Sequence, residues 1–354
     1  MGIQGIKGFE PRWRDPPDFI NGITHEIWED RNIHSLRRYY GASMAVRSPA
    51  SLVVGFDKVI SATMATLAEF PDRRLLGEDV IWCRTDAPAD WTEASPERAG
   101  EKPEDERVDN NWMRGSFLSS HRLLCTATHT RAGMYGEPSG TKLRYRILAD
   151  CAARDNAIYD EWLVRDQGAV VRQIGWDPKD YAADLIEREG GPERCVRPFH
   201  PDNDVASEYT GKGNENPIGL RHAEMLQRMM NGEMSVIKTG YDRAVQLELP
   251  GHITEHGRSS ADEFWMALRS AFPTSRFDVH HVIGREDLGS PPRSSVRWSL
   301  TGKHEGWGAF GTPTGAEVHV MGLSHAEWGP GGLRREYTLY DETAIWKQIV
   351  LKTG

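Results

Sequence analysis

The sequence is poor in the features that mark several large classes of protein. Its only cysteines are Cys83, Cys125, Cys151 and Cys195, which form no C-x-x-C pair, so buried thiols are favoured over a disulfide framework. The net charge is −9, and this deficit of basic charge argues against a nucleic-acid surface. No apolar run approaches the roughly 18 residues that span a bilayer. Because residues 1–17 lack the apolar core of a signal peptide, we expect a soluble cytoplasmic protein without membrane or nucleic-acid partners.

Motifs that bind metals or phosphates are missing as well. The histidines include the neighbouring pair His280 and His281, but no H-E-x-x-H or His-x-His spacing accompanies them. The glycines at Gly329–Gly332 form a turn between predicted strands and do not match G-x-x-x-x-G-K. We therefore expect neither a metal nor a cofactor.

The most informative feature that is present is an internal duplication. A shift of 175 residues carries the segment 129–140, H-T-R-A-G-M-Y-G-E-P-S-G, onto 304–315, H-E-G-W-G-A-F-G-T-P-T-G. Further upstream, a shift of 202 residues carries Tyr39 onto Tyr241, Gly55 onto Gly257 and Phe70-Pro71 onto Phe272-Pro273. Two constant shifts over most of the chain indicate two copies of one domain, with an insertion of about 27 residues in the first copy. A period this long is not that of a solenoid.

Apolar spacing predicts the same order of elements in both copies. Helical periodicity occurs over 20–40, with a break near 30–32, and over 59–70, and it recurs at about 218–239 and 260–271. Strand-like runs follow at 119–129, 143–149 and 158–165, and again from residues 277, 294, 317 and 333. Because the helices precede the strands and do not alternate with them, we expect an α+β fold with an antiparallel sheet in each copy.

Two segments interrupt this pattern. Residues 188–217 are rich in acidic residues, proline and glycine, which predicts a linker between a first domain at 1–187 and a second at 218–354. Residues 86–114 have a similar composition and contain Trp91 and Trp112. This insertion is either a solvated excursion or an element that covers a pocket or an interface.

The motifs resemble those of a known family. Helices followed by Phe70-Pro71-Asp72, a histidine before a G-x-P-x-G turn, and a W-x-x-x-D sequence are similar to the SnoaL-like polyketide cyclases, which belong to the nuclear-transport-factor-2-like superfamily. The resemblance covers about 18–187 and 218–354. It implies two tandem cone-shaped domains, each with helices packed in a strongly curved antiparallel sheet that encloses a pocket. It also implies sheet-to-sheet packing as an intramolecular pseudo-dimer, with further homo-oligomers left open.

The resemblance also implies a chemistry. It points to a cofactor-independent enzyme that acts by general acid/base catalysis on a small hydrophobic or polyketide-like carbonyl substrate, as an aldol cyclase, isomerase or hydratase. Asp166 and Asp341 match the family's acid/base aspartate, and His129 and His304 match the histidine that orients the substrate. Burial in an apolar cone raises the pKa of a carboxyl group toward neutrality, as such a role requires. Candidate substrate-binding residues are Trp162, Tyr337, Arg122, Arg297, Trp298 and Asp72.

The two copies depart from the family pattern differently. The second copy has Thr274 in place of the Asp72 equivalent and Tyr337 in place of the Trp162 equivalent. A tryptophan wall desolvates a nearby acid, whereas a tyrosine hydroxyl can pair with it and keep its pKa low. We therefore favour Asp166 over Asp341 as the working carboxylate.

Each candidate also has a structural interpretation. The aspartates can cap turns, the histidines can be satisfied by backbone groups, the arginines can form outward salt bridges, and the aromatic residues can belong to the core. Two other functions consequently stay open for the chain. One is a small-molecule binding protein that keeps the pocket without catalysis, and the other is a structural pseudo-dimer module.

Overall fold

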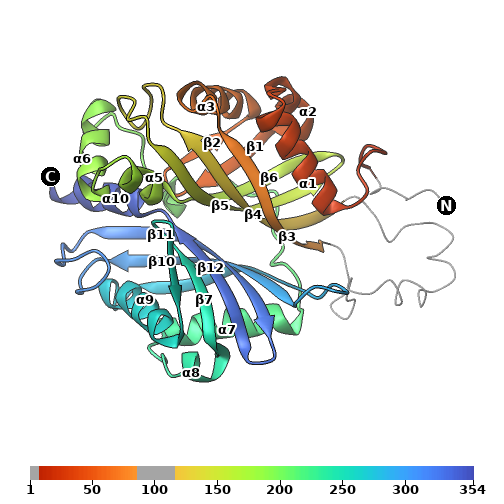
Figure 1. Cartoon of the computed structure of the whole chain (residues 1–354). Helices are drawn as coiled ribbons and strands as arrows, with labels where there is room; N and C mark the ends of the chain where they lie inside the picture. The colour runs from red at the N-terminus through yellow and green to blue at the C-terminus, as the bar shows by residue number, and fades with distance from the viewer. Residues whose placement is uncertain (1–7, 86–115) are drawn as a thin grey trace, which may run out of the picture.

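The computed structural model describes residues 8–85 and 116–354, and its two halves repeat one order of elements (Figure 1). The helices and strands of the first half are α1 (Pro16–Thr24), the π-helix η1 (His25–Glu29), the short helix η2 (Ile33–Ser35), α2 (Leu36–Tyr39), β1 (Tyr40–Ser48), β2 (Ser51–Val54), α3 (Phe56–Glu69), β3 (Arg74–Arg84), β4 (Ser116–Thr128), β5 (Lys142–Arg154), β6 (Ala157–Arg165), α5 (Gln167–Gln173) and α6 (Pro178–Arg188). After the turn η5 (Pro201–Asn203), the second half contains α7 (Pro217–Met230), α8 (Val236–Gly240), β7 (Tyr241–Leu249), β8 (Ile253–His256), α9 (Arg258–Ala271), β9 (Arg276–Arg285), β10 (Arg293–Lys303), β11 (Glu317–Gly329), β12 (Gly332–Tyr340) and α10 (Glu342–Thr353).

Each half contains one six-stranded sheet. The strand orders are β2-β1-β6-β5-β4-β3 and β8-β7-β12-β11-β10-β9, and the tandem α+β fold expected from the sequence is therefore confirmed. The expectation of a wholly antiparallel sheet is wrong at one place in each half, because β1 pairs with β6, and β7 with β12, in parallel. The hairpins β1–β2 and β7–β8, which directly precede α3 and α9, were not predicted. Their second strands, β2 and β8, have only four residues each, and β8 is exposed throughout, so neither carries a strong apolar pattern.

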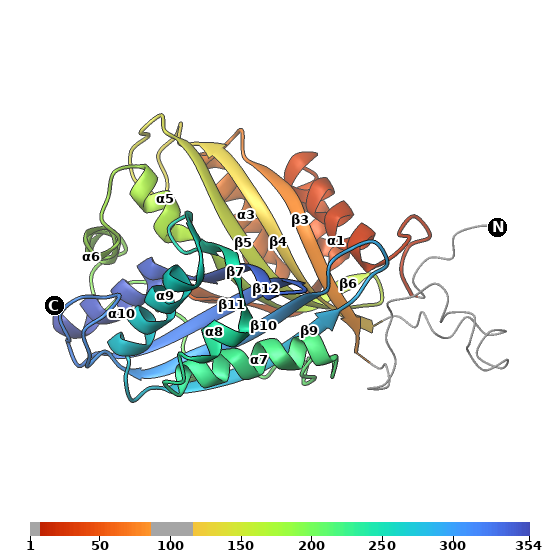
Figure 2. The same cartoon turned by 60° about the horizontal axis from the view of Figure 1, so that its bottom comes forward.

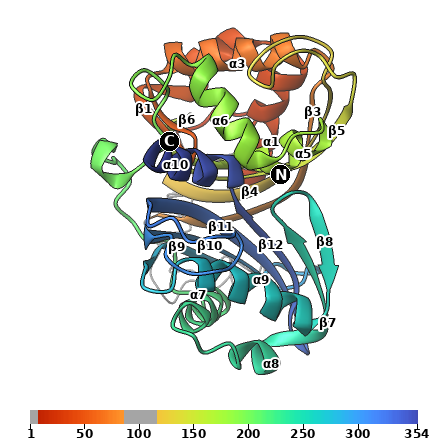
Figure 3. The ribbon, with the colours of Figure 1, turned by 90° about the vertical axis from the view of Figure 1, so that its left-hand side faces the viewer.

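The two sheets pack face to face in the middle of the molecule, and most helices cover their outer faces (Figures 1 and 2). Seen from the side, α1 and α3 lie beyond the first sheet and α7, α8 and α9 beyond the second (Figure 3). One apolar cluster spans the contact, with Leu118, Leu148 and Trp162 from the first sheet and Ile283, Leu323 and Leu339 from the second. Each sheet is thus covered on both faces, by its own helices and by the other sheet.

The pairing corrects one equivalence that the shift of 202 suggested. Tyr40 begins β1 and pairs with Ile158, while Tyr241 begins β7 and pairs with Leu333, the counterpart of Ile158. Tyr40, and not Tyr39, is therefore the counterpart of Tyr241. The register changes because the turn between β7 and β8 comprises residues 250–252, whereas the turn between β1 and β2 comprises residues 49–50.

The segment between the halves is docked along much of its length. Phe199 and Tyr209 are buried in the apolar cluster between the sheets. Arg47 of β1 donates from Nε to a carboxylate oxygen of Asp204 at 2.6 Å, and the Tyr209 amide donates to Asp160 at 3.0 Å. These contacts fix the segment against the first sheet.

Three further expectations concern the insertion, the cysteines and membrane-spanning segments. The insertion 86–114 lies outside the described residues, and the strands that flank it, β3 and β4, are neighbours in the sheet. The four cysteine side chains are buried. Among residues 8–85 and 116–354, no helix combines the length and the apolar content needed to cross a bilayer.

Candidate active site

Alternation along the strands decides which side chains face the helices and which face the other sheet. On β6, Glu161, Leu163 and Arg165 line a cavity under the helices, while Trp162 and Val164 belong to the apolar cluster between the sheets. Successive side chains of a strand point to opposite faces, so neighbouring residues have different surroundings. The same alternation places four of the predicted substrate-binding residues outside the cavity.

Those four residues form two equivalent contacts between the sheets. The guanidinium of Arg297 stacks on the ring of Trp162 at 3.9 Å, and that of Arg122 stacks on Tyr337 at 3.4 Å. The shift of 175 residues converts one contact into the other, so they are related by a pseudo-twofold axis. Near this axis the hydroxyl of Ser295 donates to that of its counterpart Ser120 at 2.6 Å. The structure therefore corrects the expected position of these residues, because they join the two halves and do not line the cavity under the helices.

Asp166 and Asp341 follow the last strand of each copy and cap the next helix. Asp166 accepts the amide of Ala169 at 3.1 Å and, from the second half, the amides of Gly251 and His252 at 2.9 Å each. Burial raises the pKa of Asp166 to about 7, although these three donors oppose the rise. Asp341 accepts the amides of Thr343 and Ala344.

A cross-half contact also reaches Asp341. The side-chain amide of Gln167, from the first half, donates to Asp341 at 2.5 Å, and burial raises the pKa of Asp341. Neither aspartate lines the cavity under the first-half helices. Both are placed as helix caps that also tie one half to the other.

The two predicted histidines hold equivalent turns. His129 Nδ1 lies 3.1 Å from the hydroxyl of Ser139, and His304 Nδ1 lies 3.1 Å from that of Thr314. Both rings are fully buried, and Nε2 of His129 lies 3.5 Å from Glu69. Since the Ser139 amide also donates to His129 Nδ1, the geometry favours the tautomer protonated on Nε2.

The last two predicted residues are also structural. Asp72 is exposed and accepts the amide of Thr128 at 2.8 Å and its hydroxyl at 2.6 Å. Trp298 is fully buried in the core of the second half, where its indole N–H donates to Ser324 at 3.0 Å. Trp298 therefore fills the place where a second cavity was expected.

The cavity of the first half is small and is lined by both apolar and polar side chains. It measures about 70 Å³ and lies between α1, η1 and the concave face of β4, β5 and β6. Apolar walls come from Ile20, Ile23 and Trp28 of the helices and from Leu123 and Ile147 of the sheet. The residues that bring chemistry to it are Tyr40, Arg73, His121, Cys151, Glu161 and Arg165.

Glu161 is the acidic residue of this cavity. It is 7% exposed and receives a hydrogen bond from the Tyr40 hydroxyl. Burial raises the pKa of Glu161 to about 7, while the Tyr40 hydrogen bond and the charge of Arg165 act in the opposite direction. A carboxyl group with this pKa exchanges protons readily at neutral pH.

The second half contains the equivalent glutamate and tyrosine, Glu336 and Tyr241, enclosed by other side chains. Glu336, the counterpart of Glu161, is fully buried and accepts the Tyr241 hydroxyl and the Thr338 hydroxyl at 2.9 Å each. The Trp265 indole N–H donates to the same Tyr241 hydroxyl at 3.2 Å. Each carboxyl oxygen of Glu336 thus accepts a hydrogen bond from the protein, whereas in the first half Leu163 stands at the position of Thr338.

Three differences between the copies place large side chains in the second half where the first half has this cavity. Trp265 and Trp298, whose rings lie 6.0 Å apart, correspond to Thr63 and Leu123. Gly322 corresponds to Ile147, and a Cβ atom added to Gly322 would meet the Trp298 ring at 2.2 Å. The indole of Trp298 therefore needs a glycine opposite it.

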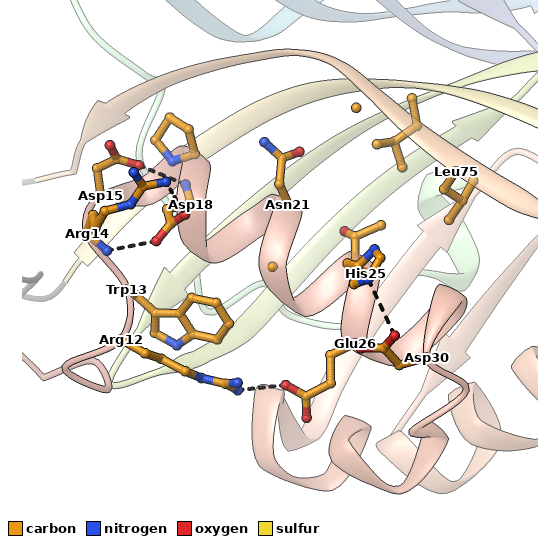
Figure 4. Close-up of a pocket in the computed structure, with 15 residues that line it drawn as sticks. Arg12, Trp13, Arg14, Asp15, Asp18, Asn21, His25, Glu26, Asp30 and Leu75 are labelled. Carbon is orange, nitrogen blue, oxygen red and sulfur yellow. Dashed lines mark hydrogen bonds and ion pairs between the residues drawn. The ribbon is translucent and has the colours of Figure 1, made fainter.

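An open groove adjoins the cavity. It measures about 760 Å³ and runs along α1 beside β3, with Thr24, Leu75 and Leu123 shared between groove and cavity walls. Figure 4 shows its charged rim, in which Arg12 pairs with Glu26 and Arg14 with Asp18.

The remaining polar groups of the cavity limit its chemistry. Burial lowers the pKa of His121 to about 4, so its ring is neutral at physiological pH. Burial raises the pKa of the Cys151 thiol, so it is not a thiolate nucleophile. Within the described part of the chain, no three His, Cys, Asp or Glu side chains gather as metal ligands. Acid/base chemistry at Glu161 is what this arrangement offers.

The shift of 175 residues carries Glu161 onto Glu336, but the family motifs do not include this position. A signal was present, because Glu161 and Arg165 are charged residues at the same parity of a strand that is otherwise largely apolar. Arg73 and His121 had no comparable signal, since nothing in the sequence brings them next to β6.

Comparisons with known proteins found solved structures that are similar to part of the chain. No protein-family model and no curated protein sequence matches it. IdmH, a candidate polyketide cyclase from Streptomyces antibioticus, is 18% identical over 46% of this chain and 99% of its own, with a TM-score of 0.33. A candidate SnoaL-like polyketide cyclase from Jannaschia is 20% identical over 38% of this chain and 94% of its own, also with a TM-score of 0.33. A third, from Acidithiobacillus ferrooxidans, is 15% identical over 44% and 92%, with a TM-score of 0.32. These structures are of the type that the sequence motifs resemble.

Proposed function

We propose that this protein is a cofactor-independent enzyme that moves a proton on a small carbonyl compound, in a reaction of the isomerase, hydratase or aldol type. The active site is the cavity of the first half, with Glu161 as the general acid/base. The second half serves as a packed partner without a site of its own.

The observation that carries this proposal is the contrast between the two equivalent glutamates. Glu336 accepts the hydroxyl groups of Tyr241 and Thr338, and Trp265 donates to the same Tyr241 hydroxyl, whereas Glu161 lines a cavity and its hydrogen-bond donor is the Tyr40 hydroxyl. A buried carboxyl group with few hydrogen-bond partners is unfavourable for stability, and such groups are found most often at functional sites.

The reaction follows from the groups that surround the cavity. Ionised Glu161 removes a proton from the carbon next to the carbonyl group, and the electron pair of the broken C–H bond forms a C=C bond. The carbonyl π electrons move to oxygen, where the positive guanidinium groups of Arg73 and Arg165 favour the developing negative charge. Protonated Glu161 then returns the proton to carbon. In a ring closure the enolate carbon instead attacks a second carbonyl group, whose π electrons move to oxygen, and Glu161 gives its proton to the resulting alkoxide.

The size of the cavity bears on the substrate. A space of about 70 Å³ has room for only a few atoms beyond the protein's own walls. This favours a small carbonyl compound over a multi-ring polyketide.

Hydrogen–deuterium exchange tests the proposal. Small ketones and oxo acids are incubated with the protein in deuterium oxide, and exchange of the hydrogens next to the carbonyl is followed by NMR. We expect Glu161→Gln to lower the exchange rate by roughly 10²–10⁴-fold. The matched control Glu336→Gln, at the equivalent position of the second half, should exchange at the wild-type rate.

A non-catalytic binding protein is the second candidate, and one observation favours it. The aspartates that match the family's acid/base residue, Asp166 and Asp341, are used as helix caps between the halves. Ligand binding without any Glu161-dependent exchange, across the same set of carbonyl compounds, would support this alternative.

A further inference from the structure

The cavity contains two arginines for which the described residues supply no acidic hydrogen-bond partner. Arg73 is 4% exposed; its Nε donates to the Tyr145 hydroxyl at 3.3 Å, and its guanidinium lies 4.7 Å from the Trp28 ring. One of its terminal nitrogens, Nη1, is buried without a hydrogen-bond acceptor, as is Nε of Arg165. Buried polar groups are nearly always satisfied, so two orphan donors in one cavity point to a missing acceptor.

The charges around these donors indicate which kind of acceptor fits the cavity. The titratable residues of the cavity are Tyr40, Arg73, His121, Cys151, Glu161 and Arg165. Tyr40 and Cys151 are neutral because burial raises their pKa values well above the usual range, and His121 is neutral as well. The two arginines therefore face a single carboxyl group, Glu161, and the cavity has an excess of positive charge.

The second half shows that the fold does not need these cations. At the positions of Arg73 and Arg165 it has Ser275 and Tyr340, both buried in a filled core. Arginine is the side chain best suited to planar two-oxygen acceptors, because its N–H donors match a carboxylate in spacing.

We propose that Arg73 and Arg165 bind a carboxylate of the substrate, so that the enzyme acts on a small oxo acid. This inference rests on the proposed function, because it names the substrate class of the same site. The carboxylate occupies the arginine end, and the carbon that loses its proton lies toward Glu161 on β6. A neutral ketone of the same size offers these donors no anionic acceptor and binds more weakly.

The experiment compares two probes of nearly the same size and shape, one with a carboxylate and the other with a neutral amide. 2-Oxobutanoate and its neutral amide, 2-oxobutanamide, are titrated against the full-length protein by NMR and calorimetry, and exchange of their C3 hydrogens is measured in parallel. We expect the wild type to bind the anion roughly 10- to 100-fold more tightly than the amide. Arg73→Ser and Arg165→Tyr, which install the residues of the second half, should each remove most of that preference.

Controls separate this inference from the proposed function. Arg131→Ser, at an exposed position of the same half, should keep the wild-type preference, and Glu161→Gln should keep it while losing exchange. Equal binding of anion and amide by the wild type would overturn the carboxylate site and needs no variant to interpret. In that case, Glu161-dependent exchange of the amide would leave the proposed function intact. Preferential anion binding that persists in both arginine variants would also overturn the inference.

Discussion

The pKa of Glu161 should make the stability of the protein depend on pH in a way that one substitution removes. The pKa is raised from 4.5 to about 7 in the folded protein, so the folded state prefers the protonated carboxyl. Such a group has its full stabilising effect below pH 4.5 and becomes destabilising as pH rises through 7. A pKa difference of this size corresponds to about 3 kcal/mol of unfolding free energy at alkaline pH.

Glu161→Gln removes this dependence because an amide does not titrate. We expect the unfolding free energy of the variant, relative to wild type, to rise by about 2–3 kcal/mol between pH 5 and pH 9. The assay is urea unfolding at closely spaced pH values, combined with the ¹³C carboxyl resonance of Glu161, which the variant assigns by its disappearance.

Glu336→Gln provides the matched comparison. Burial also raises the pKa of Glu336 to about 7, so its removal should produce a similar pH signature in stability. Only Glu161→Gln should also lose exchange activity. A Glu161 resonance that titrates near 4.5, together with a pH-independent stability difference, would falsify the reasoning that burial dominates at this site.

Further substitutions test the other assignments. Arg73→Gln should keep or raise thermal stability while weakening anion binding, because it removes a buried charge that lacks an acidic partner; a large fall in stability would contradict this. Asp166→Ala should lower the unfolding free energy by about 2–4 kcal/mol, since it leaves the amides of one helix end and of the β7–β8 turn without an acceptor. If Asp166 is instead the working carboxylate, as the sequence motifs suggested, Asp166→Asn should abolish exchange. Leu123→Trp alone should overpack the first half, at a cost of about 1–3 kcal/mol, whereas Leu123→Trp with Ile147→Gly should fold and no longer bind ligand in NMR titrations.

The fold was predictable from the sequence to a much greater extent than the site. The duplication and the order of long elements follow from constant shifts and from apolar periodicity, which depend only on local pattern. The break expected near 30–32 lies where the π-helix η1 ends and a new helical turn begins at Ile33. The helices α5 and α10 were missed because each begins directly after a strand, with its cap, Asp166 or Asp341, taken for a catalytic group.

The site was harder to predict because alternation carries little information in a sheet that is covered on both faces. Residues 147–153 of β5 are buried without interruption, so apolar side chains occur at both parities. Trp162 and Glu161 are neighbours, and nothing local to β6 reveals which of them faces the helices. The contact of Arg297 with Trp162 needs the second sheet, and the position of Arg73 near β6 needs the curvature of the first. Both are properties of the assembled chain.

The covalent link between the halves has a consequence for how such a site can change during evolution. In a dimer of identical subunits, a codon that encodes tryptophan in place of leucine closes both cavities at once, and activity is lost with the first mutation. Once the gene is duplicated and fused, one domain can acquire large side chains that fill its core, while the other domain keeps its cavity. We therefore expect one ligand to bind per chain, whereas a dimer of two identical single-domain subunits would bind two.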